Sequence, residues 1–166
     1  MPQYYDRYIN LAADIELDRA FQQSISQIRM LDLNLINKIG KKTYAPNKWT
    51  INEIIQHLID WERIFCYRAL LFARKVETNP PGFDENLMAA NSKANNKNII
   101  GIIDELKFVR QSTISLYKSF DKVDLLKTGI NWKHEMSVLA MGFTILGHQI
   151  HHFDFMKTHY YMLAEK

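Results

Sequence analysis

The sequence predicts an all-α protein, a helical bundle that forms a single domain over residues 1–166. Apolar residues recur at helical spacing over four long segments, as expected for helices that each bury one face. Nearly all of the six glycines and four prolines lie outside those segments. No run of alternating polar and apolar residues is long enough to predict a strand. A chain of 166 residues can also enclose one proper core.

Composition narrows the class of protein further. Apolar residues make up 47% of the chain and charged residues 23%, which is ordinary for a soluble globular protein. The net charge is +3, and the short basic runs at 38–42 and 93–97 lack interleaved aromatic residues, so nucleic-acid binding has little support. The start of the chain has no signal-peptide pattern, and no apolar span approaches the ~18 residues that a membrane helix needs. We therefore expect a cytoplasmic protein without a membrane or nucleic-acid partner.

The first half of the chain predicts a short leading helix and then two long ones. Residues 3–13 are rich in aromatic side chains and predict the short helix. Apolar residues at helical spacing over 16–39 predict one long helix, and Gly40 is a natural end for it. The next helix begins with Thr50 as its N-cap and Glu53 as the capping-box partner, and we expect it to end near Arg74.

The second half predicts a long connection followed by two more long helices. Residues 76–97 form the connection, and loops of this length are often lids or binding loops. A helix follows over 98–120, and then a loop over 121–136 with one helical turn at 122–127. The last helix begins near Ser137, a suitable N-cap, and extends to about Leu163. Over 138–147 it is apolar nearly all round, which places it at the centre of the bundle.

Three histidines on the two most apolar helices form a candidate metal site. His148 and His152 are four residues apart, so both lie on one face of the last helix, with ~5–6 Å between them. His57 lies within the helix that begins after Thr50. Three buried imidazoles close together are unfavourable unless a cation neutralises the arrangement. Three nitrogen ligands also leave a coordination position open, which is typical of catalytic sites. The alternative for His57 is a core histidine whose hydrogen bonds are satisfied within the fold.

Further residues are candidates for supporting roles around the three histidines. His151 lies about 60° around the helix from His148, which suits a residue that supports a ligand or lines the pocket. Glu62 interrupts the apolar face of its helix, so we expect either an ion pair with an arginine from a neighbouring helix or a contact that orients a ligand histidine. Arg68 points the same way as His57, three turns further along, and either binds a substrate anion or lies at the surface. Cys66, the single cysteine, excludes an internal disulfide, and we expect it to pack in the core rather than act as a nucleophile.

Several motifs resemble those of one known family. The segment WTINEIIQHLIDWER at 49–63 resembles the pattern W-S-x-x-E-x-x-x-H-L-x-D-x-E-R of the DinB-like (YfiT-like) metal-dependent enzymes. YRALLFAR at 67–74 and PGFDEN at 81–86 resemble further stretches of one subgroup. GHQIHH at 147–152 is similar to its closing G-H-E-x-H-H, with Gln149 where many relatives carry glutamate. The likeness spans nearly the whole chain, with the motifs in the same order.

The resemblance implies a four-helix bundle of up-down-down-up topology with a long connection between its second and third helices. It further implies a divalent metal held by His57, His148 and His152, and often a homodimer. Zinc, nickel and iron all suit imidazole ligands. Relatives include bacillithiol transferases and mycothiol-dependent isomerases, so a low-molecular-weight thiol is a candidate cosubstrate.

Three hypotheses of function follow. The leading one is a metalloenzyme in which the ion lowers the pKa of a bound thiol, which is transferred to a small electrophile. In this hypothesis Asp84 transfers protons and Arg68 binds an anion. The second is a metal-dependent hydrolase of small molecules, and the third is a metal-binding, dimeric stress protein without catalysis. The third hypothesis predicts either a closed coordination sphere or no cavity beside the ion.

Overall fold

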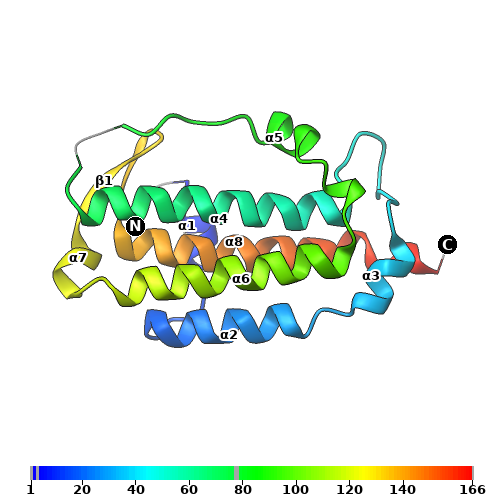
Figure 1. The fold of residues 1–166 in the computed structure, drawn as a ribbon, viewed down its shortest axis with the longest axis horizontal. Helices are drawn as coiled ribbons and strands as arrows, with labels where there is room; N and C mark the ends of the chain where they lie inside the picture. The colour runs from blue at the N-terminus through cyan, green and yellow to red at the C-terminus, as the bar shows by residue number, and fades with distance from the viewer. Residues whose placement is uncertain (1, 3, 77–78, 166) are drawn as a thin grey trace.

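A computed structural model describes residues 2, 4–76 and 79–165, and four long helices make up most of it (Figure 1). The helices α2 and α8 run in one direction along the bundle, and α4 and α6 run in the other, so the topology is up-down-down-up as expected. α4 packs against both α6 and α8, and α2 packs against the same two helices. The four helices are α2 (Leu17–Arg29), α4 (Ile51–Ala73), α6 (Ile99–Lys118) and α8 (Val138–His159).

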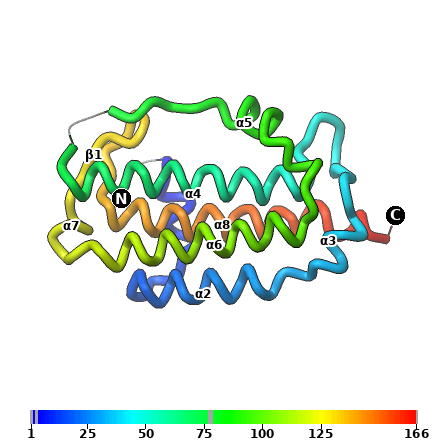
Figure 2. Tube along the Cα trace, in the orientation of Figure 1, coloured from blue at the N-terminus to red at the C-terminus, as the bar shows by residue number. Residues whose placement is uncertain are grey.

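The long connection between α4 and α6 follows from this topology. Because α4 and α6 are parallel neighbours, the chain must travel back along the whole bundle before α6 begins (Figures 1 and 2). The connection contains the short helix α5 (Glu85–Asn91) and a 3-10 turn, Ala94–Asn96, which pack against α4. It therefore places residues near 81–86 alongside the middle of the helix that carries His57.

Local capping signals account for most of the helix boundaries. Thr50 and Glu53 form the expected capping box, in which the backbone N–H of Glu53 donates to Thr50 Oγ1 and that of Thr50 donates to Glu53 Oε2. Ser137 is the N-cap of α8, and α7 (Lys122–Leu126) is the predicted helical turn. None of the helices in the described part of the chain has the length and apolar character needed to cross a bilayer.

Two predicted boundaries are wrong. The segment 16–39 forms two helices instead of one, since α2 ends at Arg29 and α3 (Leu33–Ile39) begins after Asp32. Asp32 accepts a hydrogen bond from the backbone N–H of Leu35, so it starts a new helix although the apolar periodicity continues. The last helix ends at His159 rather than Leu163 and is followed by a 3-10 turn, Tyr161–Ala164.

A small β-hairpin was missing from the predicted elements. Strands β1 (Thr128–Asn131) and β2 (His134–Ser137) pair antiparallel within the segment expected to be a loop. Each strand has only four residues, which is too short for alternation of polar and apolar residues to indicate it. The hairpin lies at the end of α4 and brings Asn131 and Trp132 towards that helix.

The leading helix α1 (Asp6–Ile9) packs directly on α8, and a glycine permits this approach. A Cβ atom on Gly147 would lie 1.8 Å from the backbone carbonyl oxygen of Tyr8. The same contact places the Tyr8 ring 5.2 Å from the His148 ring and 5.5 Å from the His151 ring, measured between centroids.

We expect Gly147→Ala to destabilise the protein, because the added methyl group must displace the Tyr8 backbone. The expected loss of unfolding free energy is about 1–3 kcal/mol, the usual range for overpacking, and urea denaturation would measure it. Gly101→Ala is the matched control, since nothing lies within 4 Å of a Cβ at that position in α6. That control should be neutral or stabilising by up to about 1 kcal/mol, and equal effects of the two substitutions would contradict the argument.

Candidate metal centre

The structure brings His57, His148 and His152 together. His57 projects from α4, while His148 and His152 project from successive turns of α8. His148 Nε2 lies 3.1 Å from His57 Nε2 and 3.1 Å from His152 Nε2. One ligand atom from each ring lies within 4.8 Å of the others. The alternative in which His57 is a core histidine with ordinary partners does not fit this convergence.

These distances fit a shared cation better than a set of hydrogen bonds. Each nitrogen of a neutral imidazole carries either one proton or one lone pair, so His148 Nε2 cannot make good hydrogen bonds to two neighbours at once. In a tetrahedral zinc site with Zn–N distances of 2.0–2.1 Å, two nitrogens are separated by about 3.3 Å. The observed spacing is close to that value. The donor set therefore suits a divalent ion such as zinc, nickel or iron.

The protonation states also suit metal binding. Burial lowers the pKa of His57 to about 4, and the nearby His151 contributes in the same direction. Burial lowers the pKa of His148 and of His152 well below the ordinary value, and in each case a neighbouring histidine of the cluster adds to the effect. All three imidazoles are therefore neutral at pH 7, with lone pairs available for an ion.

These pKa shifts predict that the metal-free protein loses stability in mild acid. Between pH 6.5 and about 4 the unfolded chain protonates His57 while the folded chain does not, so the free energy of unfolding falls as the pH is lowered through this window. The lowered pKa of His57 alone corresponds to roughly 3 kcal/mol. Urea denaturation of chelator-treated protein at several pH values would measure this loss. His57→Asn should show a shallower dependence on pH, and identical slopes for the two proteins would contradict the prediction.

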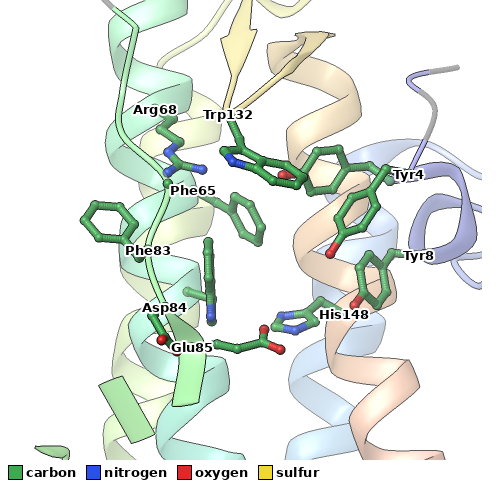
Figure 3. A pocket seen from close by; sticks show the side chains of 12 residues that line it. Tyr4, Tyr8, Phe65, Arg68, Phe83, Asp84, Glu85, Trp132 and His148 are labelled. Atoms are coloured by element: carbon green, nitrogen blue, oxygen red, sulfur yellow. The ribbon is translucent and has the colours of Figure 1, made fainter. Parts of the chain in front are cut away.

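A cavity of about 590 Å³ adjoins the histidine cluster, and His148 forms part of its wall (Figure 3). Glu85 and His148 lie at one end of this cavity, and Arg68 lies beside Trp132 at the other. Most of the remaining wall is aromatic, and its residues come from α1 and the turn before it, α4, the connection after α4 and the hairpin. These residues are Tyr4, Tyr5, Tyr8, Trp61, Phe65, Phe83 and Trp132.

Arg68 is buried in this cavity wall, so the expectation of a surface position is wrong. Its side chain is only 1% exposed. The guanidinium donates hydrogen bonds to Asn131 Oδ1 in the hairpin and to the backbone oxygen of Pro81. Its Nε has no hydrogen-bond partner among the described residues.

Asp84 and Glu85 both line the cavity, but they are placed differently. Asp84 is the N-cap of α5, and its Oδ1 accepts hydrogen bonds from the backbone N–H groups of Asn86 and Leu87. Figure 3 shows the Glu85 carboxylate extending across the cavity towards His148. Asp84 was the carboxylate expected to transfer protons, and Glu85 was not among the predicted site residues. The sequence could have indicated this difference between Asp84 and Glu85, because an aspartate directly before a new helix is most often its N-cap.

Glu62 forms an ion pair with Arg110 of α6, and an ion pair with an arginine from a neighbouring helix was one of its two expected contacts. Its carboxylate accepts hydrogen bonds from Arg110 Nε at 2.7 Å and Arg110 Nη2 at 2.9 Å, and a third from Thr113. The expectation that Glu62 orients a ligand histidine is therefore wrong. Glu62 lies five residues after His57, or about 140° around the helix, and so it faces α6 rather than α8.

Cys66 and Gln149 also bond away from the histidine cluster. Cys66 Sγ lies 3.2 Å from Thr113 Oγ1, and burial raises the pKa of its thiol to about 12, which agrees with a packing role. The Gln149 side chain donates to the backbone oxygen of Ser24 and to Gln27 Oε1, and so joins α8 to α2.

His151 lies next to the cluster without taking part in it. Its ring is 5.0 Å from the His152 ring, measured between centroids, and it lines a second cavity of about 260 Å³. This second cavity adjoins His152, whereas the larger cavity adjoins His148. His151 therefore lines the second cavity rather than the larger one, and a role in supporting a ligand stays a prediction.

The bundle and its site define a class: helical-bundle proteins with a three-histidine candidate metal site beside an aromatic pocket. The chain belongs to the DinB superfamily, whose family model matches residues 5–156. Among solved structures it is similar to YfiT from Bacillus subtilis, described as a probable metal-dependent hydrolase with an unusual four-helix bundle topology. That similarity has a TM-score of 0.66 at 15% sequence identity and covers 98% of this chain and 87% of YfiT. Comparison with curated protein sequences gives no match.

Proposed function

We propose that this protein is a divalent-metal-dependent enzyme that acts on a small molecule, with His57, His148 and His152 as the metal ligands. The observation that supports this most directly is the convergence of the three imidazoles beside a cavity, with His148 Nε2 3.1 Å from Nε2 of each of the other two. An ion held there would supply Lewis acidity and lower the pKa of a water or thiol bound to it.

Glu85 is the residue that we propose for proton transfer, in place of Asp84. Its carboxylate points to His148, and its negative charge contributes to the raised pKa of Tyr8, although burial of Tyr8 is the larger cause. A carboxylate in this position suits transfer of a proton to or from a molecule beside the cluster. Tyr8 and Trp61 are among the aromatic residues that line this cavity.

Hydrolysis is the reaction that we place first, because a free carboxylate beside the ligands suits the activation of water. The description of YfiT as a probable hydrolase points the same way. Thiol transfer is the second candidate, and the smaller cavity beside His152 favours it by offering room for another reactant. The thiol would be a separate small molecule, since Cys66 is held by Thr113.

A substrate screen separates these reactions. Protein loaded with zinc, nickel or iron would be tested against small esters and amides, and separately against an electrophile with low-molecular-weight thiols. We expect turnover that chelation abolishes and that His148→Asn lacks. Turnover of esters or amides without thiol favours the hydrolase, and strict dependence on thiol favours the transferase. No metal-dependent turnover in either arm, with metal content confirmed, would refute the proposal.

Replacing Glu85 with glutamine is expected to lower kcat by about 10²–10⁴-fold, because general acid–base catalysis contributes about this much. The metal content should not change, since the three histidines remain. Glu135→Gln, in the hairpin, is the control and should retain activity. If Glu85→Gln keeps full kcat while Asp84→Asn loses it, proton transfer returns to Asp84.

The homodimer stays a prediction. The resemblance to the family implied it, and the aromatic residues Tyr5 and Tyr8 near the start of the chain pack against the same chain's hydrophobic core. Sedimentation at micromolar concentration would decide between monomer and dimer.

A further inference from the structure

The far end of the larger cavity holds a cation without a counterion. Arg68 is 1% exposed, and no ion pair within residues 4–76 and 79–165 engages it. Its two known hydrogen bonds go to neutral oxygens, Asn131 Oδ1 and the carbonyl of Pro81. A buried charge without a counterion is costly, and such groups are usually paired.

The guanidinium keeps unused donors that are suited to an anion. It carries five N–H groups, of which the two hydrogen bonds to Asn131 and Pro81 use two. One of the remaining donors is Nε, which has no partner among the described residues. A carboxylate accepts two parallel hydrogen bonds from an arginine fork.

The charges along the cavity are separated in a way that would orient a ligand. Arg68 lies at one end, while the carboxylates of Asp84 and Glu85 lie nearer the histidine end (Figure 3). An anionic group is therefore attracted to Arg68 and repelled from the other carboxylates. Along α4, Arg68 lies 11 residues after His57, which corresponds to a rise of about 16 Å and a rotation of only about 20°. The two side chains thus project from the same face of the helix at opposite ends of the pocket.

From these observations we infer that the substrate is a small organic carboxylate with a flat, apolar body. The carboxylate binds Arg68, the body lies along the aromatic wall of the cavity, and the reacting group reaches the histidine end. A single arginine balances one negative charge, which favours a carboxylate over a phosphate dianion. The inference rests on the proposed function only in taking the histidines as the reacting end.

A purely structural role for Arg68 predicts something different. Arg68 joins α4 to the hairpin and to the connection after α4, so its removal should lower stability in either case. A structural clamp alone would not make the pocket prefer an anion over a neutral molecule of the same shape. Ligand preference therefore separates the two roles.

The test compares 3-phenylpropanoate with its neutral amide, 3-phenylpropanamide, by calorimetric titration of the zinc-loaded protein. We expect the carboxylate to bind at least ten-fold more tightly than the amide. Arg68→Met should reduce this preference to less than about two-fold, and Arg68→Lys should keep part of it, since lysine offers the charge without the fork. Arg74→Met is the matched control, an exposed arginine just after α4, and should bind as the wild type does.

His148→Asn guards against direct binding of the carboxylate to zinc and should keep the preference. Equal affinities of the wild type for carboxylate and amide would overturn the inference, as would a preference that survives in Arg68→Met but disappears in His148→Asn. Phenyl phosphate binding more tightly than the carboxylate would overturn the choice of anion. If Arg68→Met does not fold, the affinities of the wild type and of Arg68→Lys for the carboxylate and the amide still test the inference. A clear carboxylate preference without any metal-dependent turnover would support this inference and count against the proposed function alone.

Discussion

Replacing His148 with asparagine is expected to abolish tight metal binding. His148 Nε2 lies 3.1 Å from Nε2 of His57 and 3.1 Å from Nε2 of His152, so His148 is the central member of the candidate ligand set. Structural zinc sites with four protein ligands have binding free energies of about 10–16 kcal/mol, or several kcal/mol per ligand, so the loss of one ligand should weaken metal affinity by at least about 10²-fold. Elemental analysis after dialysis and competition with a chromophoric chelator would measure the stoichiometry and the affinity.

The matched control is His159→Asn, on the same helix. His159 lies 11 residues after His148, about 16 Å along α8, and its Nδ1 contacts the backbone oxygen of Phe155. We expect this variant to bind one ion per chain with unchanged affinity. Equal metal affinity of His148→Asn and the wild type would remove the metal centre from the proposal and leave a cluster of neutral core histidines.

Replacing Arg110 with methionine is expected to cost about 3–5 kcal/mol of unfolding free energy, the typical result of removing one partner of a buried ion pair. Arg110 is 1% exposed and Glu62 2% exposed, and the arginine donates to both carboxylate oxygens. It also donates to Ser24, and so it links α6 to α2 as well as to α4. The substitution leaves the Glu62 carboxylate buried and without its counterion. Urea denaturation would measure the loss.

The double substitution Glu62→Leu with Arg110→Met should recover most of that stability, because neither charge then remains buried. Lys157→Met is a surface control, since Lys157 and Asp154 are each about 60% exposed in their ion pair. It should change stability by less than about 1 kcal/mol. If Arg110→Met cost no more than Lys157→Met, the buried pair would not contribute to stability as argued.

Two of the three candidate ligands could be placed together from local spacing alone. His148 and His152 had to lie on one face of α8 once that segment formed a helix, because four residues make slightly more than one turn. His57 was added because it lies on the other strongly apolar helix and because the family motif matches it, but the packing of α4 against α8 decided that the three rings meet. The contrast between Asp84 and Glu85 shows the limit of residue type as a signal: both are carboxylates beside the pocket, yet one is used by a helix terminus and the other faces the histidines.

The sequence by itself determined the helices, most of their caps and the histidine pair, because these depend on contacts between residues a few positions apart. The capping box of Thr50 with Glu53 and the N-cap at Ser137 are of this kind. Tertiary structure decided which groups meet across helices: Glu62 with Arg110 rather than a histidine, and Arg68 with the hairpin rather than solvent. Helical rotation indicates the direction of a side chain, but the packing of four helices decides which neighbour lies there and whether water can reach it.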